Sequence, residues 1–320
     1  MLQAVTAIAT NMLAVAGALY LSNLAYTFMS RVYSLYGPSP ISISKYTADN
    51  AWAIVTGASD GIGKEFALAL AKRGFNILIM ARTQSKLDAV AKEAKEKANK
   101  KIECKVIAFD FMNASDAEYA SLQKTLDSLN VTVLVNNVGV NHDIPTPFVD
   151  ETAATIDGIV QVNVKATMKI TRIVLPAMIA KHKGIILNLG SFAGQVPTGY
   201  LSVYSASKAW LKSWSLALDQ EVKSKGVIVQ HLNTYFVTTG MSKIRKASMT
   251  TPTAKDYVRA AIASIGKGPN VTPFWSHSWA EWAMTTFVPE AYLVGYSASL
   301  NAGIRKRALA KRERESKRDN

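Results

Sequence analysis

Between Trp52 and Asn233 the sequence alternates short apolar runs with longer segments of helical periodicity, and this alternation most constrains the fold. The apolar runs read AWAIVT, FNILIM, IECKVIAF, VTVLVN, GIILNLG and VIVQHLN. Uninterrupted apolar runs of this length are typical of strands that are buried on both faces of a sheet. Strands that alternate with helices, such as the helix expected over 85–98, predict an α/β fold with a doubly wound parallel sheet.

The first apolar run leads directly into the glycine-rich segment TGASDGIG, and the helical pattern KEFALALAKRG follows it. Gly57, Gly61 and Gly63 allow the backbone to turn tightly and to approach a diphosphate at the positive end of that helix. A glycine turn without a ligand is the alternative. Because the motif follows a strand and opens a helix, it predicts a Rossmann-like nucleotide site.

The end of the second apolar run indicates which nucleotide binds. Arg82 in LIMARTQ follows Gly63 by nineteen positions, and no acidic residue stands beside it. An acidic residue at this point favours the ribose hydroxyls of NAD, whereas an arginine suits the 2′-phosphate of NADP. The sequence therefore predicts NADPH as the cofactor. Arg82 as a plain surface charge, and Asp60 inside the glycine loop, are the arguments against this choice.

Tyr204 and Lys208 lie four residues apart in VYSASKAWLKSW, within a segment of helical periodicity. Residues i and i+4 share one face of a helix, so the phenol and the ammonium are expected to be neighbours. A nearby positive charge stabilises a phenolate and lowers the pKa of the tyrosine. The spacing is common in ordinary helices, and alone it leaves a catalytic pair and a chance pair both open.

These features and three further motifs resemble the short-chain dehydrogenase/reductase family over residues 50–245. One such motif is weak evidence, but five motifs in the order of the family are specific. The motifs are TGASDGIG (56–63), NNVG (136–139), QVNVKA (161–166), LGSFAG (189–194) and YSASK (204–208).

The resemblance implies four catalytic residues. Tyr204 is expected to donate a proton to the carbonyl oxygen of a substrate, and Ser191 to hold and polarise that oxygen. Lys208 is expected to lower the pKa of Tyr204 and to bind the nicotinamide ribose. Asn163 is expected to bind a water molecule that connects Lys208 with solvent. A strand-end cap for Ser191 and a side chain that only satisfies the backbone for Asn163 remain alternatives.

The resemblance also implies the contacts with the cofactor. Asp110 is expected at the adenine, Asn136 and Asn137 beside the ribose, and Val237 and Thr239 at the carboxamide end. The full set of expected cofactor-binding residues is Val55, Gly57, Ser59, Asp60, Gly61, Ile62, Gly63, Arg82, Asp110, Asn136, Asn137, Tyr204, Lys208, Val237 and Thr239.

After the sixth apolar run the chain departs from the family pattern, because Thr234, Tyr235 and Phe236 stand where a Pro-Gly pair is usual. The segment YFVTTGMSKIRKASMTTP, together with the ends of the chain, resembles the microsomal very-long-chain 3-oxoacyl-CoA reductases near the 17β-hydroxysteroid dehydrogenase branch. This resemblance implies NADPH-dependent reduction of long-chain and very-long-chain 3-oxoacyl-CoA in fatty-acid elongation. The implied partners are the acyl-CoA substrate, the membrane and other elongation enzymes.

The N-terminal region is predicted to be a membrane anchor. Residues 1–30 contain no Asp, Glu, Lys, Arg or His, and a bilayer requires about 20 apolar residues. We therefore expect an anchor helix over 1–36 and a linker over 37–50. A signal peptide would have a basic residue before the apolar stretch, and a mitochondrial transit peptide would have arginines. A helix that lies on the membrane surface stays open as an alternative.

The catalytic domain is predicted over 51–267, and a membrane-associated helical segment over 268–304 follows it. Aromatic residues gather in this segment, as they do at membrane interfaces, and no lysine or arginine stands between Lys267 and Arg305. A true span, a helix that dips into the bilayer and the wall of a substrate tunnel all fit this pattern.

A basic tail over 305–320 holds eight basic and three acidic residues of a chain whose formal net charge is +14. Without a basic–aromatic pattern, this excess favours a solvated or membrane-surface tail over a nucleic-acid partner. The closing KRDN resembles dilysine retrieval signals. The expected location is therefore the endoplasmic reticulum membrane, with the catalytic domain facing the cytosol. Lys243, Arg245 and Lys246 are candidate contacts for coenzyme A phosphates, with a solvated basic face as the alternative.

Other functions remain open on the sequence. A steroid 17-ketone or 3-ketosphinganine reductase would use the same catalytic residues, because substrate choice depends on the loops around 193–202 and 240–255. A non-catalytic NADPH-binding scaffold is opposed by the intact Ser191, Tyr204 and Lys208. The four histidines show no metal-ligand spacing, so no metal is expected. Family members pair through the helices of the catalytic tyrosine and asparagine, which allows a homo-oligomer.

Overall fold

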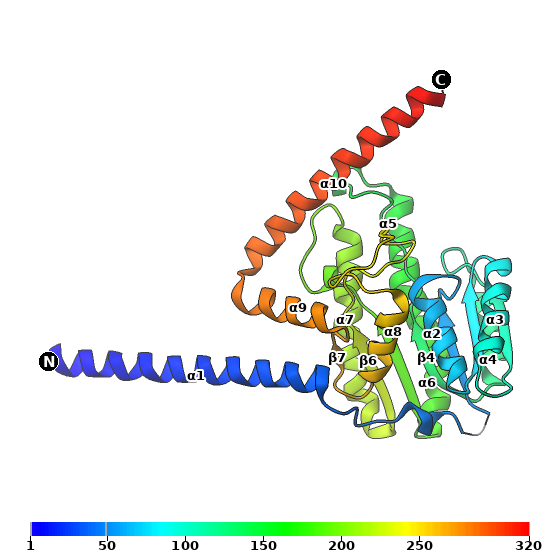
Figure 1. Ribbon diagram of the computed structural model, residues 1–320, viewed down its shortest axis with the longest axis horizontal. Helices are drawn as coiled ribbons and strands as arrows, with labels where there is room; N and C mark the ends of the chain where they lie inside the picture. The colour runs from blue at the N-terminus through cyan, green and yellow to red at the C-terminus, as the bar shows by residue number, and fades with distance from the viewer. Residues whose placement is uncertain (1, 49, 320) are drawn as a thin grey trace.

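The computed structural model describes residues 2–48 and 50–319. Residues 1, 49 and 320, which belong to the predicted anchor, linker and basic tail, lie outside the described residues. The described chain forms a seven-stranded parallel sheet with helices on both faces, and two long helices project from it (Figure 1). The predicted α/β fold class with a doubly wound parallel sheet is therefore confirmed.

The strands lie in the order β3-β2-β1-β4-β5-β6-β7, and every neighbouring pair is parallel. The direction of strand order changes between β1 and β4, where open α/β sheets bind ligands at the carboxyl ends of the strands. All six predicted strands are present. A seventh, only two residues long, extends the sheet past residue 267. The strands are β1 (Trp52–Thr56), β2 (Asn76–Ala81), β3 (Cys104–Ala108), β4 (Val131–Asn136), β5 (Gly184–Leu189), β6 (Val227–Leu232) and β7 (Asn270–Val271).

Strand β3 differs from the expectation of a strand buried on both faces. Strands β1, β2, β4 and β5 are buried along their whole length, but β3 forms an edge of the sheet and Lys105 is exposed. Val106 and Ile107 are only partly buried, one against each core. An apolar run does not reveal which strand lies at the edge, because that depends on the order of the strands in the sheet.

Two apolar cores fill the space between the sheet and its helices. Alternating residues of β1 point to opposite cores, so Ala53 packs with Phe66 and Tyr257 on one face and Ile54 packs with Leu218 on the other. The first face carries α2 (Gly61–Lys72), α3 (Gln84–Lys97) and α8 (Ala254–Ala263). The second carries α4 (Asp116–Asp127), α6 (Thr167–Ala180) and α7 (Ser202–Val222), with α5 (Ala153–Val160) leading into α6 through the π-helical turn η3 (Gln161–Ala166).

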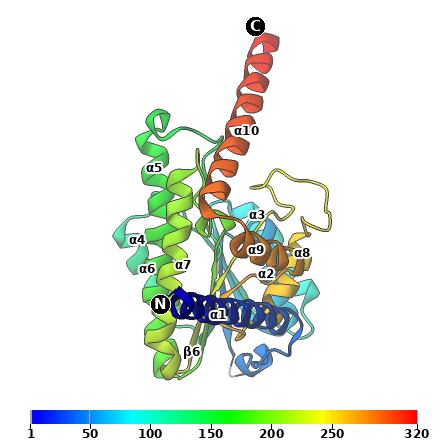
Figure 2. The same cartoon turned by 90° about the vertical axis from the view of Figure 1, so that its left-hand side faces the viewer.

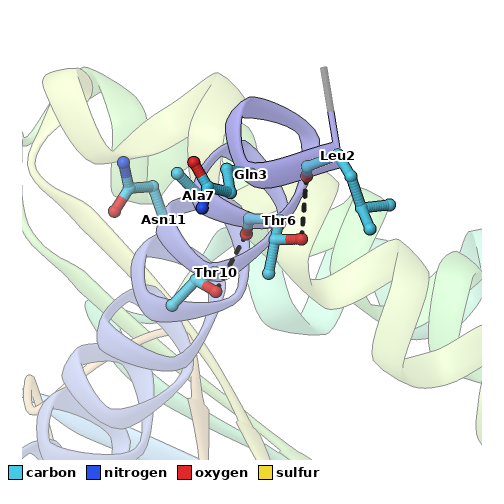
Figure 3. A pocket seen from close by; sticks show the side chains of 6 residues that line it. All are labelled: Leu2, Gln3, Thr6, Ala7, Thr10 and Asn11. Atoms are coloured by element: carbon cyan, nitrogen blue, oxygen red, sulfur yellow. Dashed lines mark hydrogen bonds between the residues drawn. The ribbon is translucent and has the colours of Figure 1, made fainter.

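Helix α1 (Leu2–Tyr36) projects from the domain as a single exposed helix (Figures 1 and 2). Within the described residues it is the one helix long and apolar enough to cross a membrane. The hydroxyls of Thr6 and Thr10 donate to the carbonyl oxygens of Leu2 and Thr6 at 2.9 and 3.0 Å (Figure 3). These hydroxyls therefore need no water, which suits a helix in lipid. The structure thus contains the predicted candidate anchor.

The segment between α1 and the sheet packs on the domain. It contains the short 3₁₀ helix η1 (Ile43–Tyr46), and both end residues of η1 contact the first core. The carbonyl oxygen of Tyr46 accepts a hydrogen bond from the Thr132 hydroxyl at 2.9 Å. The point at which α1 leaves the domain is therefore held in place.

The end of α1 packs against α9 (Trp275–Phe287). The ring of Phe28 lies 5.3 Å from that of Trp279 and 5.6 Å from that of Trp282, measured between centroids. Arg31 forms an ion pair with Glu281 at 3.0 Å, and the Glu281 side chain is only 5% exposed. An aromatic contact and a buried charge pair therefore join the candidate anchor to the domain.

Helix α10 (Glu290–Asp319) is one continuous helix that contains the end of the predicted aromatic segment and the described part of the basic tail. Because the helix continues through Arg305, the predicted boundary between residues 304 and 305 does not mark a change of structure. Phe287, Tyr292 and Tyr296 are exposed on either side of the turn from α9 to α10. In Figure 1 this turn projects in the same direction as α1.

Candidate active site

The predicted site residues gather at the carboxyl ends of the parallel strands. Most of them end or follow β1 to β6, while Asn163 comes from η3, and Tyr204 and Lys208 come from α7, where Lys208 bonds to the last residue of β5. Parallel strands end at the same edge of a sheet, so residues far apart in the sequence meet there. The site lies beside the change of direction between β1 and β4.

The glycine-rich loop after β1 has a shape that only glycine permits. Gly57 and Gly61 have positive φ angles of 65° and 57°. A methyl group on Gly57 would lie 2.9 Å from the Val138 Cα, and one on Gly63 would lie 2.3 Å from the Gly57 carbonyl oxygen. Asp60 precedes α2 without a side-chain capping bond, so the first N–H groups of α2 remain available to an anion.

Asn137 and Thr56 hold this loop against the end of β4. The Asn137 Nδ2 atom donates to the carbonyl oxygens of Thr56 and Gly57, both at 3.0 Å. The Thr56 Oγ1 atom accepts from the N–H groups of Asn137 and Val138, also at 3.0 Å. Thr56 was not among the predicted site residues, although it is the first residue of the motif TGASDGIG.

Asn136, predicted to lie beside the ribose, points into the interior instead. Its Nδ2 atom donates to Thr171 Oγ1 at 3.0 Å and to Asn188 Oδ1 at 2.9 Å, and Asn188 in turn donates to Ser215 Oγ at 2.9 Å. The residue is 4% exposed. This chain of polar contacts joins β4 and β5 to α6 and α7. Of the two asparagines, only Asn137 contacts the glycine-rich loop.

Arg82 and Asp110 lie beyond the ends of β2 and β3. Arg82 is exposed, and no carboxylate of the described residues forms an ion pair with it. The Asp110 carboxylate accepts from the Met112 N–H at 3.1 Å and from Asn113 Nδ2 at 2.8 Å, which fixes the turn after β3. The guanidinium of Arg82 is therefore free to meet an anion.

The side chains of Ser191 and Tyr204 are neighbours, and the Ser191 hydroxyl acts on the pKa of the phenol. Ser191 opens the turn η4 (Phe192–Gly194), where its Oγ atom accepts from the Ala193 N–H at 3.2 Å, so it also serves as the strand-end cap of the alternative interpretation. Burial of the phenol is the larger effect and raises the pKa of Tyr204, whereas the Ser191 hydroxyl lowers it. The phenol is therefore protonated at neutral pH and can donate.

Lys208 lies one turn further along α7. Its Nζ atom is 5.8 Å from the centroid of the Tyr204 ring and donates to the Leu189 carbonyl oxygen at 2.8 Å. The predicted neighbourhood of the two side chains is confirmed. Burial lowers the pKa of Lys208 to about 8. The predicted lowering of the Tyr204 pKa by the lysine is not found, because the phenol is buried and the ammonium bonds elsewhere.

Asn163 lies in the π-helical turn η3 and is 2% exposed. Its Oδ1 atom accepts from the Val140 N–H at 2.8 Å, and its Nδ2 atom donates to the Val140 carbonyl oxygen and to Ser207 Oγ, both at 3.0 Å. A methyl group on Gly139 would come within 3.4 Å of Asn163 Oδ1 and 3.7 Å of Lys208 Nζ. The side chain satisfies backbone groups, as the alternative interpretation stated, and π-helical turns are frequent at functional sites.

The loop after β6 lies over the glycine-rich loop. A methyl group on Gly61 would lie 3.1 Å from Thr239 Cγ2, so Thr239 reaches the predicted cofactor site. The side chain of Val237 is buried in the first core instead. Ser242 donates its hydroxyl to the Val237 carbonyl oxygen at 2.6 Å and accepts from the Thr239 N–H at 3.3 Å, which holds the loop in this position.

Three further predicted contacts lie on β1 and the glycine-rich loop. The Val55 side chain is fully buried in the first core, so this residue meets a ligand only through its backbone. Ser59 and Ile62 are half-buried on the loop, beside the glycines.

An aromatic stack beside the site was not identified from the sequence. The ring of Phe192, the residue after Ser191, stacks on that of Tyr235 with centroids 4.0 Å apart. Tyr235 in turn contacts His277 of α9 at 5.2 Å. The sequence contained one indication of this stack, because Thr234-Tyr235-Phe236 replaces the usual Pro-Gly pair. In the structure, the ring of Tyr235 lies between η4 and α9.

Two surface hollows lie away from this site. One is lined by residues of the first turns of α1 (Figure 3), and the other lies between α2, α3 and α8. Neither contains a predicted site residue. In residues 2–48 and 50–319, no group of three or more His, Cys, Asp and Glu is placed to hold a metal ion.

Residues 51–249 match the family described as short chain dehydrogenase, and the chain belongs to this family. The family that the sequence motifs indicated is thereby confirmed, and with it the predicted class of enzyme, an oxidoreductase that uses a nicotinamide cofactor.

The chain is similar to a protein of Podospora anserina named very-long-chain 3-oxoacyl-CoA reductase. The two are 43% identical over 310 residues, which cover 94% of this chain and 91% of the relative. Among solved structures, a 7beta-hydroxysteroid dehydrogenase matches with a TM-score of 0.71 at 19% identity, over 80% of this chain and 99% of that chain. A metagenomic short-chain oxidoreductase in complex with NADP matches with a TM-score of 0.58 at 28% identity, over 71% and 97%.

Proposed function

We propose that this chain is an NADPH-dependent reductase of long-chain and very-long-chain 3-oxoacyl-CoA. The observation that carries the proposal is the neighbouring pair of hydroxyls on Ser191 and Tyr204 with Lys208 beside it, in a chain 43% identical to a reductase of that name. The pair offers a carbonyl oxygen two neighbouring hydroxyl donors at the carboxyl end of β5.

The residues present fit NADPH. The close approach of Gly57 and Gly63 leaves room for a diphosphate at the start of α2, and Arg82 offers its free guanidinium to a 2′-phosphate. Asp60, whose negative charge would oppose the 2′-phosphate of NADPH, is exposed and lies towards Gly240. Bound in this site, NADPH supplies the hydride that reduces the carbonyl carbon.

The chain's own residues manage the charge that develops on the carbonyl oxygen. Ser191 donates a hydrogen bond to that oxygen, and Tyr204, protonated because it is buried, transfers a proton to it. The ammonium of Lys208 lies over the phenol ring, where its bond to the Leu189 carbonyl oxygen holds it. Asn163 acts as a positioning residue, because it ties the loop after β4 to α7 beside Lys208.

The same proposal includes the membrane. Helix α1 crosses the bilayer, and the exposed Phe287, Tyr292 and Tyr296 at the turn from α9 to α10 rest at its surface, where aromatic side chains are favoured. A reductase held at the membrane can take up a long acyl chain that partitions into lipid. We place the enzyme in the endoplasmic reticulum membrane with its catalytic domain in the cytosol, beside the other elongation enzymes.

The experiment is NADPH oxidation by the detergent-solubilised full chain. A long-chain 3-oxoacyl-CoA, a 17-ketosteroid and 3-ketosphinganine are offered in parallel, with Tyr204→Phe as the matched variant. We expect turnover of the acyl-CoA that falls by roughly 10²- to 10⁴-fold in Tyr204→Phe, while NADPH binding is retained. Turnover of only the steroid or the sphingoid ketone would overturn the substrate assignment, and NADPH binding without any turnover would indicate a scaffold.

A further inference from the structure

Helix α10 passes over the loop that leads to Tyr204. The Asn301 Nδ2 atom donates to the Gly199 carbonyl oxygen at 2.8 Å, and a methyl group on Gly199 would lie 2.7 Å from the Ala298 Cβ. Ser297 donates to the Pro197 carbonyl oxygen at 3.3 Å. The first half of α10 therefore lies directly on the segment between η4 and α7.

The second half of α10 turns basic side chains to a neighbouring loop. Arg305 donates to the Pro145 carbonyl oxygen and to Thr146 Oγ1, both at 3.0 Å, and Arg312 forms an ion pair with Asp143. Residues seven apart share a helix face, so Arg305 and Arg312 lie on the same side of α10. The Thr146 N–H donates to the carbonyl oxygen of Tyr200, four residues before Tyr204, at 2.8 Å.

A third segment brings another cation to the same point. The Lys243 Nζ atom lies 3.6 Å from Asp143 Oδ1, so Lys243 and Arg312, distant in the sequence, meet at one carboxylate. Lys243, Asp143 and Arg312 are all exposed. Arg245 and Lys246 follow in the same loop, exposed and without ion-pair partners in the described chain. Lys243 and Arg312 at Asp143, with Arg245 and Lys246 up to three residues after Lys243 in its loop, are called the basic cluster below.

We infer that this basic cluster binds the phosphate groups of the acyl-CoA substrate, an inference that rests on the proposed function. Lys243 and Arg312 already converge on the two oxygens of one carboxylate, and a phosphate group offers the same kind of acceptors. The phosphates of coenzyme A are separated from the thioester by the long pantetheine arm. They therefore belong at the rim formed by α10 and the loops, away from Tyr204 itself.

The test compares two thioesters of one 3-oxoacyl chain, one with coenzyme A and one with N-acetylcysteamine, which has no phosphates. In a Lys243→Gln/Arg312→Gln variant, we expect KM for the CoA thioester to rise about tenfold and KM for the N-acetylcysteamine thioester to stay unchanged. The matched control is Arg307→Gln/Arg314→Gln, which removes the same charge from the opposite side of α10. Equal changes with both thioesters, or the same rise in the control, would overturn the inference.

Anionic lipid headgroups offer the same phosphate chemistry, and a second arm separates the two sources. KM for the CoA thioester is measured for the full chain in vesicles of phosphatidylcholine, with and without phosphatidylserine. A difference between wild type and the double variant in phosphatidylcholine alone supports coenzyme A. A difference that requires phosphatidylserine means that the cluster binds lipid, and the inference is wrong.

Failure of the proposed function is distinguishable from failure of this inference. If the wild type reduces neither thioester, the proposed function is wrong. Binding of adenosine 3′,5′-bisphosphate, measured by calorimetry, then tests the basic cluster without turnover. We expect its affinity to fall about tenfold in Lys243→Gln/Arg312→Gln and to stay unchanged in Arg307→Gln/Arg314→Gln. No binding by the wild type would overturn the inference.

Discussion

The ammonium of Lys208 lies over the ring of Tyr204, with 5.8 Å between Nζ and the ring centroid, but its hydrogen bond goes to the Leu189 carbonyl oxygen. The two side chains therefore interact through space. Burial acts on them in opposite directions, since it raises the pKa of the phenol and lowers that of the ammonium. Both shifts favour the uncharged form of the group, which is the protonated phenol of Tyr204 and the neutral amine of Lys208.

This arrangement predicts a pH dependence of stability. Burial lowers the pKa of Lys208 from 10.5 to about 8, so the unfolded chain binds more protons than the folded chain between these values. Below pH 8 the buried charge of Lys208 therefore lowers the free energy of unfolding by its full amount. This penalty is lost as the pH rises to 10.5. Relative to Lys208→Met, the free energy of unfolding is expected to rise by about 3 kcal/mol over this range. Denaturant titrations of both proteins check this, and a constant difference would contradict the lowered pKa.

The glycine-rich loop predicts a sharp contrast between two Gly→Ala substitutions in helices. Gly63→Ala places a methyl group 2.3 Å from the Gly57 carbonyl oxygen, so we expect a loss of about 1–3 kcal/mol and much weaker NADPH binding. The control is Gly295→Ala in α10, where nothing lies within 4 Å and alanine favours the helix. Thermal unfolding and NADPH fluorescence measure both effects. Similar behaviour of the two variants would show that Gly63 is not sterically required.

The choice between the two nicotinamide cofactors is expected to depend on Arg82. Arg82→Gln removes a charge-assisted contact with the 2′-phosphate, worth roughly 1.5–3 kcal/mol. The Kd for NADPH should therefore rise roughly 10- to 100-fold while that for NADH stays unchanged. Lys86→Gln, at another exposed cation of the same region, serves as the control. An equal loss of affinity for both cofactors would place Arg82 away from the 2′-phosphate.

The joint between α1 and α9 is expected to depend on one ion pair. Arg31→Met leaves the Glu281 carboxylate buried, with only the Asn233 amide at 2.8 Å and the Thr272 hydroxyl as partners. We expect a loss of about 3 kcal/mol, because an unpaired buried charge is costly. Adding Glu281→Gln should restore part of it. Thermal unfolding of the single and double variants measures the coupling, and additive losses would show that the pair contributes nothing specific.

Much of the fold and part of the site could be predicted because the signals are local. Each strand is a short apolar run, the glycine-rich turn lies between one strand and one helix, and Tyr204 and Lys208 share a helix face through their spacing alone. Such features depend on residues within a few turns of one another. The exposed edge strand β3 did not follow from its own residues, because burial depends on which strands flank it.

Only the tertiary structure decided which groups meet across the sheet and between segments that are distant in the sequence. The Asn136 side chain turns inward because Thr171 and Asn188 satisfy it there, and the Lys208 ammonium bonds to Leu189 because β5 passes beneath α7. The sequence determined the class of fold, the nucleotide loop and the reacting side chains. The partners of those side chains, their pKa values and the course of α10 over the loops depend on packing, which spacing along the chain does not encode.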